Sequence, residues 1–299
     1  MEAFLIALLI AATPLLLAAT GELVAERSGV LNLGVEGMML MGAVSAFAVA
    51  FSTGSHTLAI LAGAGAGLIM AALFAFIALF CLANQMATGL ALTIFGIGLS
   101  GLVGQDFVGQ PIDRLAQLQV ETTAIGRVLL SHDVLVYFSF MALIGTYVFL
   151  NHTRAGLMLR AVGDNHTAGH ALGLQVRMIR TLAVLFGGLM AGLGGAYLSL
   201  AYTPLWGEEM TAGRGWIALA LVVFATWQPI RLLFGAWLFA AVTQLQFYGQ
   251  DWGIALPSQF LAMAPYLATI IALVIISQAP SRSRSVTPAE IGRSFRAER

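Results

Sequence analysis

Long stretches without charged residues divide the sequence into windows that are long enough to cross a membrane. A transmembrane helix needs about 20 apolar residues, and a charge inside the bilayer is costly, so such windows mark candidate spans. The charge-free stretches are 3–21, 37–105, 134–153, 181–207, 215–230, 232–250 and 252–281. Polar residues at 52–57 and 84–85 divide the longest window into three parts.

This pattern predicts an all-α bundle of about nine transmembrane helices, with eight or ten as the alternatives. The expected spans are 3–21, 30–51, 58–82, 87–104, 134–151, 181–202, 215–228, 232–248 and 260–277. The seventh window is short, and Pro14 and Pro265 can break their helices. Residues 1–277 form the expected transmembrane domain with an internal loop at 152–180, and residues 278–299 form an Arg/Ser-rich cytoplasmic tail without fixed structure.

Composition supports a membrane protein. The chain is 59% hydrophobic and 9% charged, whereas soluble domains carry about 25% charged residues. The first span follows Met1 and Glu2 without a basic segment, so we expect it to be retained rather than cleaved as a signal peptide. The net charge is zero, and nothing suggests nucleic acid as a partner. We expect a multi-pass protein of the cell membrane.

The arginines predict the orientation, because positively charged residues concentrate on the cytoplasmic side of a membrane. With nine spans and the C-terminus inside, three arginines fall outside, at positions 114, 127 and 214. The other eleven fall inside, at positions 27, 154, 160, 177, 180, 231, 282, 284, 293, 296 and 299. The sequence therefore predicts an outer N-terminus and an inner C-terminus.

The residue types exclude several chemistries. All 14 basic residues are arginine, so the chain has neither the lysine of a Walker A loop nor that of a Schiff-base cofactor site. Cys81 is the only cysteine, which rules out an intrachain disulfide and a cysteine metal site. We expect no cofactor, no bound metal and no enzymatic activity, with any ATP hydrolysis carried out by a separate chain.

Three alternatives remain open at this stage. Residues 98–101 read GLSG, which matches an intramembrane serine protease motif, but all five histidines fall in loops or at span ends. His166 and His170 have a spacing that suits a metal ion on one helix face, although a solvated helix explains them better. A stand-alone secondary carrier would need carboxylates within the membrane. Glu36, near the inner end of the second span, is the nearest candidate.

The internal loop has the features of a docking segment. It alternates small, apolar and polar residues, and Asp164 or Asn165 can cap a helix of about two turns that ends near Gly173. Such a helix, lying parallel to the membrane, would suit a cleft in a partner protein. A solvated connector is the alternative.

Three sequence stretches resemble a known family. Residues 160–173 read RAVGDNHTAGHALG, residues 21–43 read GELVAERSGVLNLGVEGMMLMGA, and residues 213–220 read GRGWIALA. The first is similar to the coupling loop of ABC importer permeases in the branched-chain amino acid, ribose and nucleoside superfamily. His170 and Gly169 stand where alanine is more usual. The other two resemble the nucleoside and simple-sugar branch.

The resemblance implies a permease subunit that forms half of a translocation pathway. The implied partners are an ATPase subunit, a second and paralogous permease, a substrate-binding protein outside the membrane, and the lipid bilayer. The ATPase-coupling loop would use Arg154, Gly156, Arg160, Ala161, Gly163, Asn165, Ala168, Ala171 and Gly173. Glu208, Glu209 and Arg214, expected on the outer side, would receive the binding protein, with a solvated turn as an equal alternative.

Further polar residues are candidates for the pathway or for its inner border. Glu22, Glu26 and Arg27 are expected to form a charged elbow after the first span, and Asn32 would satisfy the backbone of an interrupted helix. Glu36, Asn84, Gln85 and Thr88 complete this set, and structural bracing is the alternative role for Asn32 and Glu36.

The spans offer amides, hydroxyls and aromatic rings but no expected interior charge. This lining suits an uncharged nucleoside first and a simple sugar second, whereas a zwitterionic branched-chain amino acid would cross with its charges unpaired.

Overall fold

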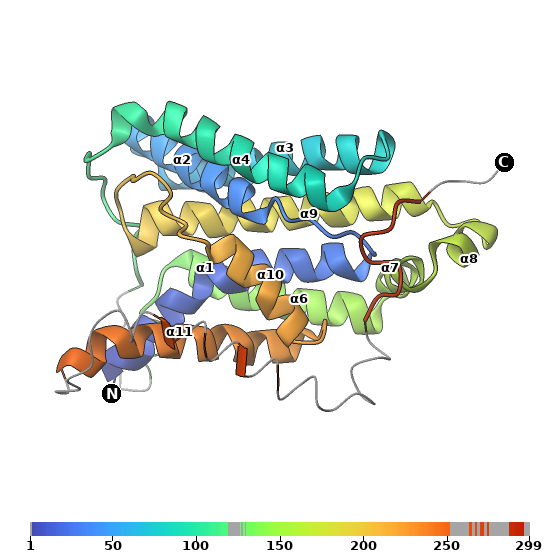
Figure 1. The fold of residues 1–299 in the computed structure, drawn as a ribbon. Coiled ribbons are helices and arrows are strands. Elements are labelled where there is room, and N and C mark those ends of the chain that lie inside the picture. The colour runs from blue at the N-terminus through green and yellow to red at the C-terminus, as the bar shows by residue number, and fades with distance from the viewer. Residues whose placement is uncertain are drawn as a thin grey trace.

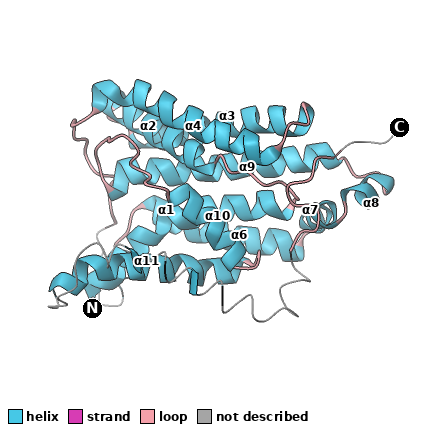
Figure 2. Cartoon of the chain, in the orientation of Figure 1, coloured by secondary structure: helices cyan, strands magenta, loops and turns pink. Residues whose placement is uncertain are grey.

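The computed structural model describes residues 2–118, 126, 128, 130–251, 263, 264, 267, 270, 271, 274 and 287–295. In these residues the regular structure is helical, and the loops add only isolated bridges such as that between Val108 and Trp206. Figure 2 shows helices joined by loops throughout the described chain. The expected all-α fold is confirmed.

Six helices in the described part of the chain are long and apolar enough to cross a membrane. They are α1 (Glu2–Arg27), α2 (Val35–Thr53), α3 (His56–Ala75) continued by η1 (Phe76–Phe80), α4 (Gln85–Gly104) followed by η2 (Gln105–Phe107), α6 (Val134–His152), and α9 (Val176–Tyr197) continued by η3 (Leu198–Tyr202). These helices correspond to the first six expected spans.

Two further apolar helices occupy the positions of the seventh and eighth expected spans. They are α10 (Arg214–Phe224) and α11 (Pro229–Asp251). The 11 residues of α10 extend about 16 Å, roughly half of a bilayer core. Helix α10 therefore cannot cross the membrane alone. Most of the ninth expected span, 260–277, lies outside the described residues.

Helix α1 is longer than the sequence pattern predicts. It continues through Pro14 without ending, and it extends six residues beyond the expected end at 21, to Arg27. The expectation that Pro14 breaks this helix is wrong. Pro265 lies outside the described residues.

Helix α9 forms the centre of the bundle and packs on α1, α2 and α3 (Figure 1). Small residues make these contacts possible, because a Cβ atom added at Gly67 of α3 would collide with the carbonyl oxygen of Gly188 in α9. A Cβ atom at Gly192 would likewise meet the carbonyl oxygen of Gly63. The Gly63/Gly67 and Gly188/Gly192 pairs are therefore packing contacts, as such pairs commonly are in membranes.

Several spans expose apolar side chains on the surface of the bundle. Leu61 and Ile69 of α3 are 63% and 68% exposed, Ile94 of α4 is 71% exposed, and Ile144 of α6 is 63% exposed. Isolated exposed apolar residues are ordinary, but this many on spanning helices indicate contact with lipid tails.

The two ends of the bundle carry different connections. Helices α7 (Arg154–Asp164) and α8 (His166–Ala171) lie at one end, on the right in Figure 1, together with the segment 287–295. The loop 203–213 and the connection that begins with η2 lie at the opposite end.

Candidate functional site

Two non-helical segments enter the bundle and meet where α2 and α10 begin. Residues 28–34 connect α1 to α2, and residues 203–213 connect η3 to α10. Figure 1 shows α10 in the middle of the bundle's length rather than at either end. A Cβ atom added at Gly215 would lie 2.6 Å from the Cα atom of Glu36, so the first turns of α2 and α10 are in direct contact. Two of the three sequence stretches singled out above form this junction.

The side chain of Glu36 joins the two segments. Its Oε1 atom accepts hydrogen bonds from the Thr211 hydroxyl at 2.5 Å and from the Gly213 amide at 2.8 Å, and its Oε2 atom accepts one from the Gly215 amide at 2.6 Å. The first amides of a helix have no partner within the helix and favour a negative charge. Glu36 therefore caps α10 from another helix. It does not lie near the inner border of the bundle, as expected, but beside a loop that was placed on the outer side.

The segment 28–34 is held by side chains from α1 and α4. The Oδ1 atom of Asn32 accepts a hydrogen bond from the Gly34 amide at 2.9 Å, which confirms the expected bracing of an interrupted helix. The Thr93 hydroxyl donates to the Leu33 carbonyl oxygen at 3.0 Å. These contacts satisfy backbone groups that a continuous helix would pair internally.

Glu22 and Glu26 are buried inside the bundle, each only 1% exposed. The Asn32 amide donates to Oε1 of Glu22 at 3.3 Å, and the Trp227 indole donates to Oε2 of Glu26 at 2.5 Å. The expected charged elbow is therefore wrong, because α1 continues as a helix to Arg27 and turns both carboxyl groups inward. Among the described residues, the carboxyl groups of Glu22, Glu26 and Glu36 are buried in the bundle where none was expected. The expected absence of interior charge therefore no longer bears on the substrate.

The expected pathway residues of α4 serve mainly to build its first turn. Asn84 caps the helix by accepting from the Ala87 amide, and the Thr88 hydroxyl donates to the Asn84 carbonyl oxygen at 2.8 Å. Gln85 reaches further, because its Oε1 atom accepts from the Leu31 amide at 2.9 Å.

The internal loop contains two helices where one was predicted. Asn165 caps α8 by accepting from the Ala168 amide at 2.8 Å, and Gly173 follows the helix with a positive φ of 83°. The cap and the helix end were both expected. Helix α7 was missed, although Thr153 caps it by accepting from the Gly156 amide at 3.0 Å.

The expected coupling residues separate into exposed and buried groups. The exposed ones are Arg154, Ala161, Asn165, Ala168, Ala171 and Gly173, with Arg160 half-buried. Gly156 and Gly163 are buried instead. A Cβ atom added at Gly163 would collide with the Arg27 carbonyl oxygen, so Gly163 faces the bundle and not a partner. Beside these residues, Leu172 is an exposed large hydrophobic side chain, at 81%.

The loop 203–213 has an exposed and an inward-facing part. Glu208 and Glu209 are exposed. Arg214 instead braces the loop, because it donates to the carbonyl oxygens of Met210 and Thr211 at 3.2 Å each and lies 5.2 Å from the centre of the Tyr202 ring. Of the three residues expected to receive a binding protein, the two glutamates remain accessible.

The motifs behind the enzyme and metal alternatives have structural contacts. The Ser100 hydroxyl donates to the Ile97 carbonyl oxygen at 3.0 Å. The Nδ1 atom of His166 lies 3.2 Å from Arg180 Nη2 and 3.2 Å from Glu290 Oε2. Across the described residues no group of three metal-ligating side chains is found.

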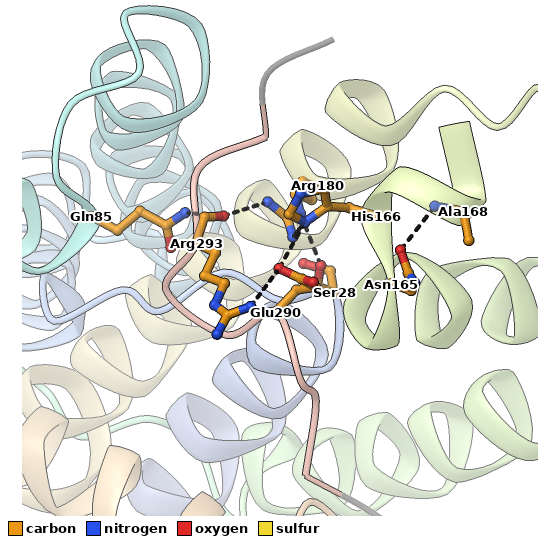
Figure 3. Close-up of polar contacts among 8 residues, drawn as sticks. All are labelled: Ser28, Gln85, Asn165, His166, Ala168, Arg180, Glu290 and Arg293. Carbon is orange, nitrogen blue, oxygen red and sulfur yellow. Dashed lines mark hydrogen bonds and ion pairs between the residues drawn. The ribbon is translucent and has the colours of Figure 1, made fainter. Parts of the chain in front are cut away.

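The contacts of Arg180, Glu290 and Arg293 were not anticipated from the sequence (Figure 3). Arg180 is 1% exposed, and its Nη1 atom donates to the Arg293 carbonyl oxygen at 2.8 Å. The expectation of an unstructured tail is therefore wrong for residues 287–295. The sequence just before this segment, with Arg282 and Arg284, gives no indication that the segment packs on the bundle.

Comparisons with known proteins identify relatives over nearly the whole chain. The family described as "Branched-chain amino acid transport system / permease component" matches residues 4–277. The putative glucose ABC transporter permease TsgC13 of Haloferax volcanii is 38% identical over 96% of this chain and 95% of its own. The nucleoside ABC transporter permease NupC of Lactococcus lactis is 34% identical over 90% of each chain. The guanosine ABC transporter permease NupQ of Bacillus subtilis is 30% identical over 89% of each.

Two of these organisms contribute a second, more distant match. The glucose ABC transporter permease TsgB13 of H. volcanii is 25% identical over 90% of this chain, and the nucleoside ABC transporter permease NupB of L. lactis is 23% identical over 77%. No solved structure matches the chain significantly.

Proposed function

The chain belongs to the permease components of the branched-chain amino acid transport family, and from this we propose that it forms half of the translocation pathway of an ATP-driven importer for nucleosides or simple sugars. The resemblance found in the sequence is thereby confirmed at the level of the family. The substrate, the partners and the membrane orientation are the further content of the proposal.

The geometric observation that carries the proposal is the junction of α2 and α10 at Glu36. Transport proteins commonly place a substrate where interrupted helices meet, because the helix ends present unpaired backbone groups there. In this chain the segments 28–34 and 203–213 approach from opposite ends of the bundle and are joined by Glu36 through three hydrogen bonds. A relative movement of the two ends would therefore be felt at this junction.

Nine spans, with the N-terminus outside and the C-terminus inside, agree best with the arginine distribution. The helices α7 and α8 then face the cytoplasm, and so do Arg154, Arg160 and Arg177 near them. The expected ninth span, 260–277, completes this proposed topology, and most of it lies outside the described residues. Multi-pass insertion in the cell membrane follows from this arrangement.

Helix α8 and Leu172 provide the contact for the ATPase subunit. Ala168, Ala171 and Leu172 are exposed on a short helix that is capped at Asn165 and ends before Gly173. A small, rigid and partly apolar projection suits a cleft in a partner protein. The chain itself has no lysine for a Walker A loop, so ATP hydrolysis belongs to that partner.

A second permease completes the pathway. Two of the organisms with relatives of this chain each have two permeases that match it at different levels of identity. We infer that this chain also pairs with a diverged paralogue rather than with itself. Glu208 and Glu209, exposed at the opposite end from α8, would receive a substrate-binding protein.

Competition for uptake tests the substrate. Cells that express the complete system should take up labelled guanosine or glucose, and unlabelled nucleosides or sugars should displace it. The names of the relatives favour nucleosides and sugars equally, so both probes are needed. Uptake of leucine without competition by either class would contradict the substrate but leave the permease function intact. A matched control is the same system without its ATPase subunit.

A further inference from the structure

The segment 287–295 packs against the two helices of the internal loop. The Glu290 amide donates to the Gly163 carbonyl oxygen of α7 at 3.0 Å. Phe295 is 7% exposed and belongs to an apolar cluster with Val162 of α7 and Val176 of α9. Its ring lies edge-on to the rings of His166 and His170 in α8, with 5.3 Å between ring centres in both cases. One end of the segment is therefore fixed to α8.

The same segment is also bonded to the non-helical connection that leads to Glu36. The Gly292 amide donates to the Gly29 carbonyl oxygen at 3.2 Å. Gln85 also links the segments 287–295 and 28–34. Its Nε2 atom donates to the Arg293 carbonyl oxygen at 3.4 Å, and its Oε1 atom accepts from the Leu31 amide. These contacts join residues that are as far as 208 positions apart in the sequence.

The buried guanidinium of Arg180 connects the segment 287–295 to the segment 28–34 and to α8 (Figure 3). It donates to the Arg293 carbonyl oxygen at 2.8 Å and to the Ser28 carbonyl oxygen at 3.1 Å, and it lies 3.2 Å from His166 Nδ1. Glu290 adds an ion pair to Arg293 at 3.7 Å. A guanidinium that donates to several acceptors makes a rigid connection, because its N–H groups point in fixed directions within one plane.

We propose that residues 287–295 form a tether that transmits the movement of α8 to the segment 28–34, and hence to the Glu36 junction. The inference rests on the proposed function, in which an ATPase moves α8. Packed side chains and hydrogen bonds to backbone atoms resist deformation, so a displacement of α8 would pull on the tether rather than stretch it. The tether thus makes the C-terminal segment part of the energy-coupling path.

Truncation of the anchoring side chain tests the tether in the complete transporter with both permeases, the ATPase and the binding protein. Phe295→Ala should leave the ATPase bound but lower guanosine or glucose uptake about fivefold or more, while ATP hydrolysis falls less than about twofold. Phe295→Leu should restore part of the uptake. Ser294→Ala, at an exposed neighbouring position, serves as the matched control.

The ratio of substrate transported to ATP hydrolysed is the deciding quantity. A ratio in Phe295→Ala equal to that of the wild type would overturn the tether, and so would parallel loss of ATPase binding and uptake. If the wild-type complex itself takes up neither guanosine nor glucose, the proposed function fails instead. The two failures are therefore distinguishable in one assay.

A disulfide separates a tether from a latch that must open. A Cβ atom built at Gly292 lies 3.9 Å from the Leu31 Cβ atom, which is within the range for a disulfide. In a Cys81→Ser background, Gly292→Cys with Leu31→Cys should cross-link and retain at least about half of the uptake of its own reduced form. Because the two forms share the same substitutions, strain at Gly292 affects both. Uptake that is lost on oxidation and regained on reduction would show that the segment has to detach, and would overturn the proposal.

Discussion

Glu36 is the residue on which the contact between α2 and α10 depends most directly. It is 6% exposed and accepts three hydrogen bonds, two of them from amides that α10 cannot pair internally. A hydrogen bond to a charged group contributes about 1.5–3 kcal/mol, and an unpaired buried donor costs a similar amount. Replacement of this carboxylate should therefore lower both the stability of the protein and its transport activity.

We predict that Glu36→Gln lowers the free energy of unfolding by about 3 kcal/mol. The glutamine amide has one acceptor oxygen instead of two, and its NH₂ group would face a backbone N–H group that is itself a donor. Thr211→Val removes a single donor and should cost about 1 kcal/mol. Thermal unfolding in detergent measures both, with Glu208→Gln at the exposed part of the same loop as the control. Equal stability of Glu36→Gln and the control would contradict the role of Glu36 as a helix cap.

His166 gives the tether a dependence on pH. Burial lowers the pKa of His166 from its usual value of 6.5, and the charges of Arg180 and Arg293 lower it further, while Glu290 opposes them. The folded state therefore favours the neutral ring. Its contribution to stability is complete above the usual pKa and declines as the pH falls below that value.

Acidification from about pH 7.5 to about pH 5.5 should accordingly lower the unfolding temperature of the wild type more than that of His166→Asn. Asparagine keeps a polar group at this position but cannot take up a proton. His152→Asn, at an exposed position of α6, should behave as the wild type does. The assignment fails if the His166→Asn and wild-type proteins lose the same amount of stability.

At the scale of elements, close approach of α3 and α9 is controlled by individual glycines. A Cβ atom at Gly67 would collide with the Gly188 carbonyl oxygen, whereas one at Gly65, two residues earlier in α3, would meet nothing within 4 Å. Overpacking a tight contact costs about 1–3 kcal/mol. Gly67→Ala should therefore lower the unfolding temperature measurably in detergent, and Gly65→Ala should leave it unchanged or raise it slightly. Similar effects of the two substitutions would show that α3 and α9 tolerate separation.

Helix α8 allows a test of ATPase docking that avoids the folded core. Gly163 is unsuitable for this test, because it packs against Arg27. Leu172 is 81% exposed, and burial of a leucine side chain is worth about 1.5–3 kcal/mol. Leu172→Ala should weaken binding of the ATPase subunit about tenfold or more in co-purification. Leu61→Ala, 63% exposed on α3, is the matched control; equal binding in both variants would argue against docking at α8.

The sequence pattern predicts the spanning helices well, because long apolar windows have few other solutions in a membrane. It fails at their interruptions. The windows place a helix at 30–51, but α2 begins at Val35, because Asn32 and Thr93 pair the backbone before it. The helix α7 was overlooked since its arginines and small residues read equally well as a connector.

At the scale of the whole molecule, the unpredicted features are contacts between distant parts of the sequence. Glu36 bonds to residues 175 to 179 positions away, and Gln85 bonds to Arg293 at a separation of 208. A single sequence contains local periodicity but no record of such pairs. The motif at 21–43 and the motif at 213–220 were both recognised, yet only the fold shows that they meet. The tether was missed for the same reason.

The orientation of the whole bundle can be tested at its two ends. Eleven arginines fall on one side under the proposed topology and three on the other, a bias that favours α7 and α8 in the cytoplasm. In a Cys81→Ser background, Gln110→Cys lies in the connection after η2 and Thr167→Cys lies in α8, and both positions are exposed. A membrane-impermeant maleimide should label Gln110→Cys in intact cells and Thr167→Cys only after the membrane is opened. Each protein labelled in detergent serves as its own reference for complete reaction. The reverse pattern would place α8 outside, where no ATPase could reach it, and would remove the basis for coupling through that helix.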